Sequence, residues 1–180
     1  MRRGKPAAKR QRLLSAKGIT LLVGRLAAAI RRRNPRTGNL ALVGIKRRGV
    51  PLAQRLARLL GGNVPVGAVD ITLYRDDLRL VAETPIVHGS ELGFDINGRT
   101  VVLVDDVIFT GRTVRAALAE LLDYGRPQAI QLAVLIDRGH RELPIAPDFT
   151  GRVLKTGRDD IVDIFLTETD GRDEVTLTRR

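Results

Sequence analysis

The chain has 180 residues, of which 43% are hydrophobic, a composition that supports a folded protein with its own core. It has no cysteine, which excludes disulfides and thiolate metal sites, and His88 and His140 are too few and too separated to predict a zinc site. Its apolar stretches fall far short of the ~20 residues that span a bilayer. Arginines also interrupt the apolar region near the amino end, so we expect a cytoplasmic protein without an export signal or membrane span.

The net charge of +11 is distributed unevenly along the chain. Residues 1–69 contain 17 of the 31 lysines and arginines and none of the 20 acidic residues. This asymmetry favours a polyanionic partner such as nucleic acid, and the alternative is a solvated basic surface with a disordered tail. Because only 3% of the residues are aromatic, RNA binding would depend on phosphate contacts and shape more than on base stacking.

The amino-terminal part of the chain divides into an arm and a helix. Residues 1–15 have the composition of a flexible basic arm, and residues 16–180 are expected to form one domain. Apolar side chains recur at helical spacing from Ile19 to Ile30, and Asn34 followed by proline ends this helix. We expect its apolar face to pack on a sheet and its basic face to meet RNA or water.

A strand, a basic loop and a helix follow in that order. The strand is predicted at residues 40–45, the loop is Lys46-Arg47-Arg48-Gly49, and the helix extends from Val50 to Leu60. A second strand is predicted from Val64 to Leu73. Residues 74–95 are polar and irregular, which is typical of a mobile lid or a β-hairpin.

The segment from Val101 to Thr113 is the most informative part of the sequence. An aliphatic run typical of a strand buried on both faces ends in two adjacent carboxylates, Asp105 and Asp106. A Thr-Gly-Arg-Thr turn and a predicted helix to Tyr124 follow. Amides at the start of a helix favour an anion, so the segment offers a phosphate site beside two acids, as a sugar phosphate with vicinal hydroxyls requires. The alternative is that the acids only cap the helix.

Three later strands are predicted at 130–136, 161–166 and 175–177. The alternation of strands and helices predicts an α/β fold with a mostly parallel, twisted sheet flanked by helices. Because parallel strands end at one edge, the 46–49 loop, the 105–113 segment and residues 137–141 should converge there. The cations of the basic loop predict a pyrophosphate site. The glycine-rich P-loop motif is missing from the sequence, which disfavours a P-loop nucleotidase.

The segment from Val101 to Thr113 resembles the signature of the type I phosphoribosyltransferases, which bind phosphoribosyl pyrophosphate (PRPP). The resemblance implies their fold, with a small hood over the carboxyl ends of the strands, and Mg²⁺ held by Asp105 and Asp106 directly or through the ribose hydroxyls and pyrophosphate. It also implies a cis peptide bond near Lys46. The implied PRPP contacts are Lys46, Arg47, Arg48, Asp105, Asp106, Val107, Ile108, Phe109, Thr110, Gly111, Arg112 and Thr113.

Residues 42–46, 70–78 and 137–145 resemble the family of bifunctional pyrimidine operon regulators that are also uracil phosphoribosyltransferases. The resemblance extends from about Ala16 to Val162 and implies UMP formation from uracil and PRPP. It implies binding to a messenger RNA leader that uridine nucleotides strengthen and guanosine nucleotides oppose, by a homodimer or homotetramer. The implied residues are Asp105 and Asp106 for catalysis; Asp137, Arg138 and Val162 for the base, under a hood of residues 139–149; Tyr74, Arg75 and Asp76 in a lid; and Arg25, Arg32, Arg33, Arg138 and Arg141 for RNA.

Several alternatives stay open at this point. The chain could transfer the phosphoribosyl group to another base, such as a purine, although the 137–145 motif argues against this. It could also be a regulator that binds RNA and senses nucleotides without catalysis. If the reaction uses a general base, the candidates are Asp106, Asp76 and Asp77.

Overall fold

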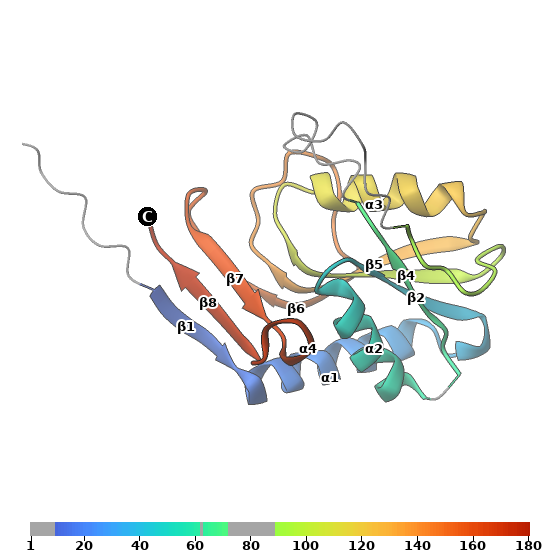
Figure 1. Ribbon diagram of the computed structural model, residues 1–180, viewed down its shortest axis with the longest axis horizontal. Coiled ribbons are helices and arrows are strands. Elements are labelled where there is room, and N and C mark those ends of the chain that lie inside the picture. The colour runs from blue at the N-terminus through green and yellow to red at the C-terminus, as the bar shows by residue number, and fades with distance from the viewer. Residues whose placement is uncertain (1–9, 62, 72–88) are drawn as a thin grey trace, which may run out of the picture.

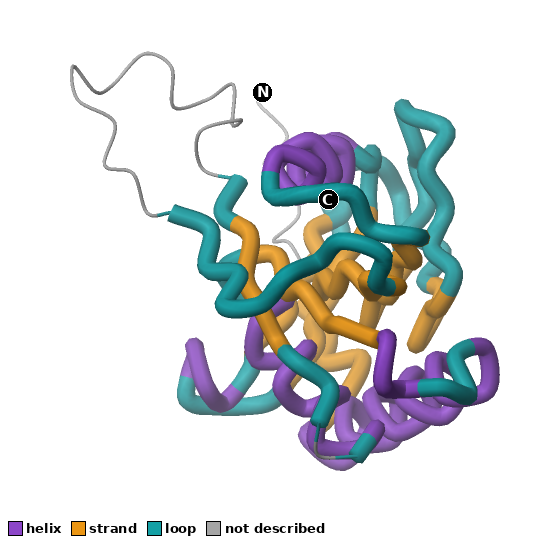
Figure 2. The backbone as a smooth tube through the Cα atoms, turned by 90° about the vertical axis from the view of Figure 1, so that its right-hand side faces the viewer, coloured by secondary structure: helices purple, strands orange, loops and turns teal. Residues whose placement is uncertain are grey.

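The computed structural model describes residues 10–61, 63–71 and 89–180, and it contains two sheets (Figures 1 and 2). The larger sheet has five parallel strands in the order β3-β2-β4-β5-β6. The smaller sheet has three antiparallel strands in the order β1-β8-β7. The strands are β1 (Arg10–Ser15), β2 (Leu40–Ile45), β3 (Val66–Val69), β4 (Thr100–Ile108), β5 (Ala129–Asp137), β6 (Phe149–Val153), β7 (Ile161–Phe165) and β8 (Glu174–Thr178).

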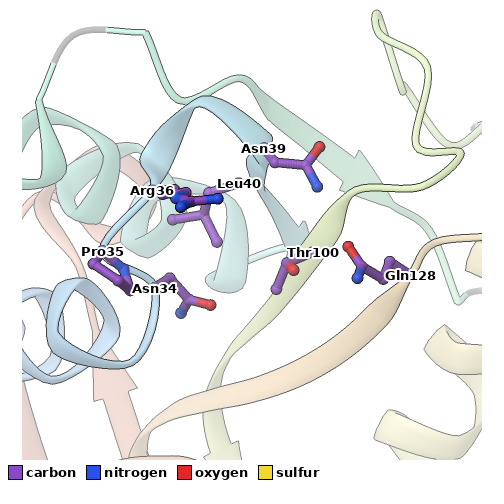
Figure 3. Close-up of a pocket in the computed structure, with 7 residues that line it drawn as sticks. All are labelled: Asn34, Pro35, Arg36, Asn39, Leu40, Thr100 and Gln128. Carbon is purple, nitrogen blue, oxygen red and sulfur yellow. The ribbon is translucent and has the colours of Figure 1, made fainter.

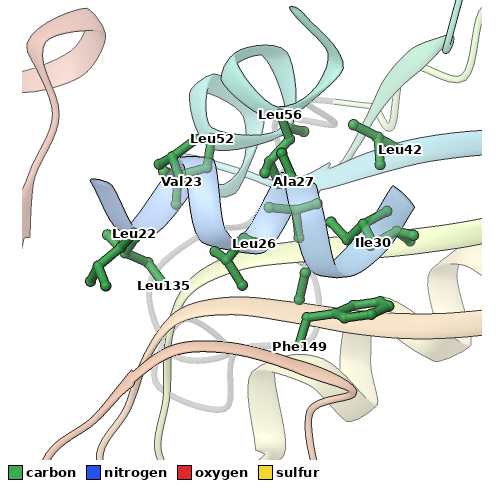
Figure 4. Close-up of a cluster of buried hydrophobic side chains, with 14 of the residues drawn as sticks. Leu22, Val23, Leu26, Ala27, Ile30, Leu42, Leu52, Leu56, Leu135 and Phe149 are labelled. Carbon is green, nitrogen blue, oxygen red and sulfur yellow. The ribbon is translucent and has the colours of Figure 1, made fainter. Parts of the chain in front are cut away.

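Helices cover both faces of the larger sheet. They are α1 (Ala16–Arg33), α2 (Gly49–Leu60), α3 (Arg112–Asp123) and the short α4 (Thr167–Asp170), with a 3-10 turn at Thr37–Asn39. Side chains alternate along each strand, so Leu42 and Leu135 pack with α1 and α2 in one core cluster (Figure 4). Their neighbours Val43 and Val134 point to the other face and pack with α3 in a second cluster. This arrangement confirms the predicted α/β sheet with helices on both faces.

Helix α1 has the two faces that its sequence predicts. Ile19, Leu22, Leu26 and Ile30 are among its buried residues, and the helix ends where the Asn34 amide donates to the Ile30 carbonyl oxygen at 2.9 Å. The basic residues of the helix, which begin at Lys17 and continue to its last turn, are exposed. The apolar stripe therefore fixes α1 to the sheet and leaves its cations on the surface.

Two glycines allow α2 to begin close to the larger sheet. A Cβ on Gly44 of β2 would lie 2.4 Å from the Val50 Cα, and a Cβ on Gly49 would lie 2.2 Å from the Val104 carbonyl oxygen of β4. Neither separation allows a side chain, so both positions need glycine. This close contact places the 46–49 loop directly beside the end of β4.

The structure corrects three of our expectations. The second half of the predicted basic arm, Arg10–Ser15, is strand β1 and pairs with β8, a partner that no local pattern identifies. The two late strands are present as predicted, and β7 and β8 pair antiparallel in the small sheet. Residues 139–149 do not form the hood by themselves, because Phe149 begins β6, which extends the larger sheet. The predicted strand from Val64 to Leu73 is also shorter, and its last two residues lie outside the described part.

Within the described ranges, no helix is both long enough and apolar enough to cross a lipid bilayer.

Candidate functional site

The carboxyl ends of β2, β4 and β5 meet at one edge of the larger sheet. Gly44 pairs with Val104, and Ile108 pairs with Asp137, so the three strands end side by side. Beyond the strand ends, the Glu142 amide donates to the Thr110 carbonyl oxygen at 2.9 Å. The structure therefore brings together the basic loop, the carboxylate pair and the segment after β5, as the parallel topology predicts.

The carboxylate pair lies at the end of β4 and is largely removed from solvent. Asp105 is 6% exposed, and Asp106 is half-buried. The Asp106 amide donates to Asp105 Oδ1 at 2.9 Å, and the Val107 amide donates to Asp106 Oδ1 at 2.8 Å. These bonds fix both carboxylates while leaving lone pairs for a ligand.

Burial changes the ionisation of both acids. Burial and then the charge of Asp106 raise the pKa of Asp105 well above its usual value. Burial also raises the pKa of Asp106, and the positive charge of Arg48 opposes that shift. The negative charge of this pair is therefore unfavourable where it lies, and a ligand that donates hydrogen bonds or brings a cation stabilises it.

The turn after β4 has the geometry of an anion site. Gly111 has φ 92° and precedes the first residue of α3, and the first turn of that helix contains no acidic side chain. The amides at this helix start therefore face no competing carboxylate from their own helix turn. Arg112 is exposed and its Nε donates to Glu142 Oε2 at 2.9 Å. The turn can hold a phosphate through backbone amides, with Arg112 at its rim.

The basic loop contains the expected cis peptide bond, between Lys46 and Arg47. Two of its three cations are paired with carboxylates. Lys46 Nζ lies 3.1 Å from Glu91 Oε1 and 4.0 Å from Asp70 Oδ2, and Arg48 forms a two-bond ion pair with Asp170. Arg47 is exposed. The loop is thus a fixed arrangement of charges rather than three solvated side chains.

Arg138 has a different place from the one expected. It is 8% exposed, and its Nη2 donates to the carbonyl oxygens of Gly157, Arg158 and Asp160 at 3.0, 3.3 and 2.7 Å. Its guanidinium also stacks 4.0 Å from the Phe109 ring centroid. A side chain this buried offers little surface to RNA, so the position of Arg138 gives no support to its predicted RNA contact. Arg138 instead fastens the segment before β7 to the end of β5.

The segment after β5 is held together by its own polar groups. Asp137 Oδ1 accepts from the Gly139 amide at 2.9 Å and lies 2.8 Å from Arg141 Nη2. Arg141 Nη1 also donates to the Phe109 carbonyl oxygen at 2.7 Å, so its side chain is used within the fold and not in an RNA surface. The predicted RNA role of Arg141 therefore finds no support in its position. His140 has φ 62°, and its ring Nε2 lies 2.7 Å from the Thr156 carbonyl oxygen.

The remaining predicted residues lie elsewhere. Arg25, Arg32 and Arg33 are exposed on α1, and Arg33 lies 3.4 Å from Asp148. Val162 is in β7, where it pairs with Leu177 and packs against the core cluster of α1 and α2. The predicted lid residues Tyr74, Arg75 and Asp76, and the candidate base Asp77, lie outside the described residues.

One contributor to the site was missed. Asp170 of α4 binds Arg48 of the basic loop, although 122 residues separate them. The only local signal is the acidic run from Glu168 to Glu174, and an acidic run usually indicates a solvated surface. Its partner could not be read from the sequence because the contact depends on how the two sheets are joined.

A cavity lies at the other end of the sheet (Figure 3). It has a volume of about 610 Å³ and is lined at the amino ends of β2 and β4 by residues that include Leu40 and Thr100. Two side-chain amides in its lining already form hydrogen bonds within the protein. Asn34 Nδ2 donates to Gln131 Oε1, and Asn39 Nδ2 donates to the Gly98 carbonyl oxygen. This cavity is separate from the carboxylate pair and has no acid in its lining.

A magnesium ion would have to share its ligands with a substrate. Among the residues that the structure describes, no three acidic or imidazole side chains gather as a metal site. Mg²⁺ commonly takes one or two protein carboxylates and completes its shell with water and substrate phosphates. The buried, partly satisfied pair Asp105 and Asp106 fits that requirement, with the remaining ligands coming from the bound substrate.

Known proteins agree with this arrangement. The family model described as phosphoribosyl transferase domain matches residues 9–168, and the chain belongs to that family. Several relatives named bifunctional protein PyrR cover almost the whole chain. The protein from Pelotomaculum thermopropionicum is 53% identical over 175 residues, which is 95% of this chain and 97% of that protein. The one from Clostridioides difficile is 49% identical over 173 residues, which is 94% of this chain and 98% of that protein.

Solved structures show the same fold at low identity. A hypoxanthine phosphoribosyltransferase from Trypanosoma cruzi has a TM-score of 0.72 at 20% identity and covers 96% of both chains. A hypoxanthine-guanine phosphoribosyltransferase from Bacillus anthracis has a TM-score of 0.71 at 16% identity, covering 92% of this chain and 96% of that one. These likenesses show the type I phosphoribosyltransferase fold.

Proposed function

We propose that the protein transfers the phosphoribosyl group of PRPP to uracil, giving UMP and pyrophosphate, and that it also binds the messenger RNA leader of pyrimidine genes in response to uridine nucleotides. One observation carries the transferase half. The buried carboxylate pair lies beside a glycine turn at a helix start, in a chain that belongs to the phosphoribosyl transferase domain family. The RNA-binding half is supported by the relatives, which are named bifunctional protein PyrR.

In this reaction a bond forms between a uracil ring nitrogen and C1 of the ribose, and the bond from C1 to the pyrophosphate oxygen breaks. Pyrophosphate leaves with the bonding electron pair, and the proton of the uracil nitrogen passes to solvent or to the departing pyrophosphate. Positive charge develops on the sugar, as in other glycosyl transfers. The chain contributes position and charge to this process and supplies no covalent nucleophile.

Each part of the site has a separate task. Asp105 and Asp106 accept hydrogen bonds from the ribose hydroxyls, which stabilises carboxylates that burial has made unfavourable. The turn from Thr110 to Thr113 holds the 5′-phosphate through its amides. The 46–49 loop receives the pyrophosphate. When bound, Mg²⁺ neutralises charge on the leaving pyrophosphate.

The base is placed beside the segment after β5. Asp137 and the backbone around it present hydrogen-bonding groups to uracil, which is neutral and needs no cation. Arg138 supports this pocket without touching the base, because it binds carbonyl oxygens of residues 157–160 and stacks on Phe109. Val162 follows this held segment and supplies backbone to the same pocket. The lid at Tyr74, Arg75 and Asp76 stays a prediction.

RNA binding is assigned to the exposed face of α1. Arg25 and Arg32 point to solvent on a helix whose other face is buried in the core, so phosphates can reach their guanidinium groups. Arg33 shares this face but also lies near Asp148. We propose that the protein acts in the cytoplasm as a homodimer or homotetramer, which sedimentation of the purified protein measures directly.

The first test is nucleotide formation. The protein is incubated with Mg²⁺ and PRPP, and uracil, orotate, hypoxanthine or guanine is offered separately, with products separated by chromatography. We expect UMP from uracil and no product from the other bases. A purine nucleotide would overturn the choice of base, and no product from any base would leave a nucleotide-sensing regulator as the better account.

The second test concerns RNA. Binding of the protein to the leader transcript of its own pyrimidine genes is measured with and without UMP at several salt concentrations. The double substitution Arg25→Ala and Arg32→Ala should weaken binding about 10-fold. It should also lower the dependence of log K on log salt by roughly 1 to 2, because fewer counterions are released when two phosphate contacts are lost. Arg58→Ala, at an exposed position of α2, is the matched control, and UMP formation should not change in either variant.

A further inference from the structure

We propose that Asp170 is a positioning residue for phosphoribosyl transfer: it holds the Arg48 guanidinium at the pyrophosphate loop, beside the carboxylate pair. Asp170 lies in α4, between the two carboxyl-terminal strands of the small sheet, and it does not belong to the larger sheet that forms the rest of the site. The inference rests on the proposed transferase function and adds a residue to its machinery.

The contact between the two side chains is specific in geometry. Arg48 Nε donates to Asp170 Oδ2 at 3.0 Å, and Arg48 Nη2 donates to Asp170 Oδ1 at 2.9 Å. A bidentate pair of this kind fixes the plane and the direction of the guanidinium as well as its distance. It uses one edge of the guanidinium. Nη1 on the other edge has no hydrogen-bond partner among the described residues, so it can donate to an oxygen of the leaving pyrophosphate.

Asp170 is itself held in place. Its Oδ2 also accepts from the Leu166 amide at 3.0 Å and from the Thr169 hydroxyl at 2.7 Å. With the two bonds from Arg48, its carboxylate accepts four hydrogen bonds, which is close to its full capacity. A carboxylate so occupied is suited to holding a neighbouring cation rather than to accepting a proton or a metal ion.

Arg48 occupies a useful point in the site. It lies in the loop that begins with the cis peptide bond, immediately before α2, and its charge acts on Asp106. Its side chain is 33% exposed and that of Asp170 is 15% exposed, so the pair is partly removed from water. The position of one cation therefore affects both the pyrophosphate loop and the ribose carboxylates, and Asp170 sets that position.

A second ion-pair network, independent of Asp170, also attaches α4. Arg55 of α2 binds two other carboxylates of this segment, with Nε to Glu168 Oε1 at 2.9 Å and Nη1 to Asp173 Oδ2 at 2.6 Å. This network joins α4 and its flank to α2 without touching the 46–49 loop. Asp170→Asn keeps a side-chain oxygen that can still accept from the Leu166 amide, so α4 should stay in place while the ion pair with Arg48 is lost.

The chain thus offers a matched pair of substitutions. Asp170→Asn removes the charge that holds Arg48, and Asp173→Asn removes a charge of the Arg55 network in the same segment. For each protein, UMP formation gives KM for PRPP and kcat, pyrophosphate gives an inhibition constant, titration calorimetry with Mg²⁺ gives the Kd for PRPP, and thermal unfolding gives Tm.

We expect Asp170→Asn to raise the KM and Kd for PRPP and the pyrophosphate inhibition constant about 10-fold, the loss expected when a charge-assisted pair no longer orients a ligand-binding cation. Asp173→Asn should change these constants less than about 2-fold, since it lies outside the loop contacts. Asp170→Glu, which keeps the charge, should recover part of the affinity. In an Arg48→Ala background, Asp170→Asn should have no further effect on the Kd for PRPP.

Equal effects of Asp170→Asn and Asp173→Asn would overturn the proposal, because α4 would then act only as a structural support. The same holds if Asp170→Asn lowers Tm but leaves all PRPP constants unchanged. The outcome is separable from that of the proposed function. If the unsubstituted protein forms no UMP, the transferase proposal fails, and the calorimetric Kd values still decide whether Asp170 positions Arg48.

Discussion

Two groups of carboxylates in this molecule have opposite environments. Asp105 and Asp106 at the end of β4 are buried next to each other, and burial raises the pKa of each. Glu168 in α4 and Asp173 just after it are bound by Arg55, which lowers their pKa values. The first pair therefore keeps its hydrogen-bonding capacity for a ligand, and the second group stabilises the fold. The partner of a carboxylate, more than its place in the sequence, distinguishes the two roles.

The largest expected difference between the two carboxylate groups is in the rate of UMP formation. Asp106→Asn should lower kcat/KM for PRPP at least ~100-fold, because it removes a charge placed where the transition state becomes positive. Asp173→Asn should leave UMP formation close to that of the unsubstituted protein. Initial rates at saturating uracil measure both. Full activity of Asp106→Asn would show that this carboxylate is a helix cap, which is the alternative that the sequence leaves open.

A smaller effect is expected on stability, to which the Glu168 and Asp173 group contributes through Arg55. Arg55→Met should lower the free energy of unfolding by about 2 to 3 kcal/mol, because it leaves the Asp173 carboxylate, which is largely shielded from water, without its partner. Arg58→Met on the exposed side of the same helix is the control and should change it by less than about 0.5 kcal/mol. Urea unfolding gives both values, and equal values would mean that the Arg55 network adds nothing to the fold.

The smallest effect concerns pH. A carboxylate with a raised pKa costs stability where it is charged, so Asp105→Asn should raise the urea midpoint at pH 7. This gain should shrink as the pH falls toward about 4, because the folded protein then protonates Asp105 before the unfolded chain does. Asp173 has a lowered pKa, so its stabilisation is present above about pH 4 and lost at lower pH.

At pH 7, Asp105→Asn and Asp173→Asn should therefore shift the urea midpoint in opposite directions. Both differences should diminish in acid. The measurements are made without PRPP and with a chelator, so that no bound cation stabilises the Asp105 carboxylate. Shifts of the same sign at pH 7 would contradict the contrast between the two groups.

The larger sheet and its edge were predictable because their signals are local. The aliphatic run at residues 101–104 identifies a strand buried on both faces, and parallel strands must end at one edge. Those two facts place Asp105 and Asp106 beside the 46–49 loop before any coordinates are known. The α1 helix was equally clear from the spacing of its apolar residues.

The rest depends on contacts that no local pattern carries. Nothing in Arg10–Ser15 indicates that it pairs with β8, and this short basic segment has the composition of a tail. Arg138 looks like a surface cation by its residue type, and its burial follows only from the three carbonyls that converge on it. The contact of Arg48 with Asp170 likewise requires both sheets to be in place.

The pairing of β1 with β8 has a consequence for how the protein is made (Figure 1). Arg10 and Thr176 touch although 166 residues separate them, so β1 has no partner until translation has passed β8. The five-stranded sheet is complete in sequence at Val153, well before that point. During synthesis Asp105 and Asp106 therefore leave the ribosome before Asp170, and a prematurely ended chain would contain that pair without the carboxylate that binds Arg48.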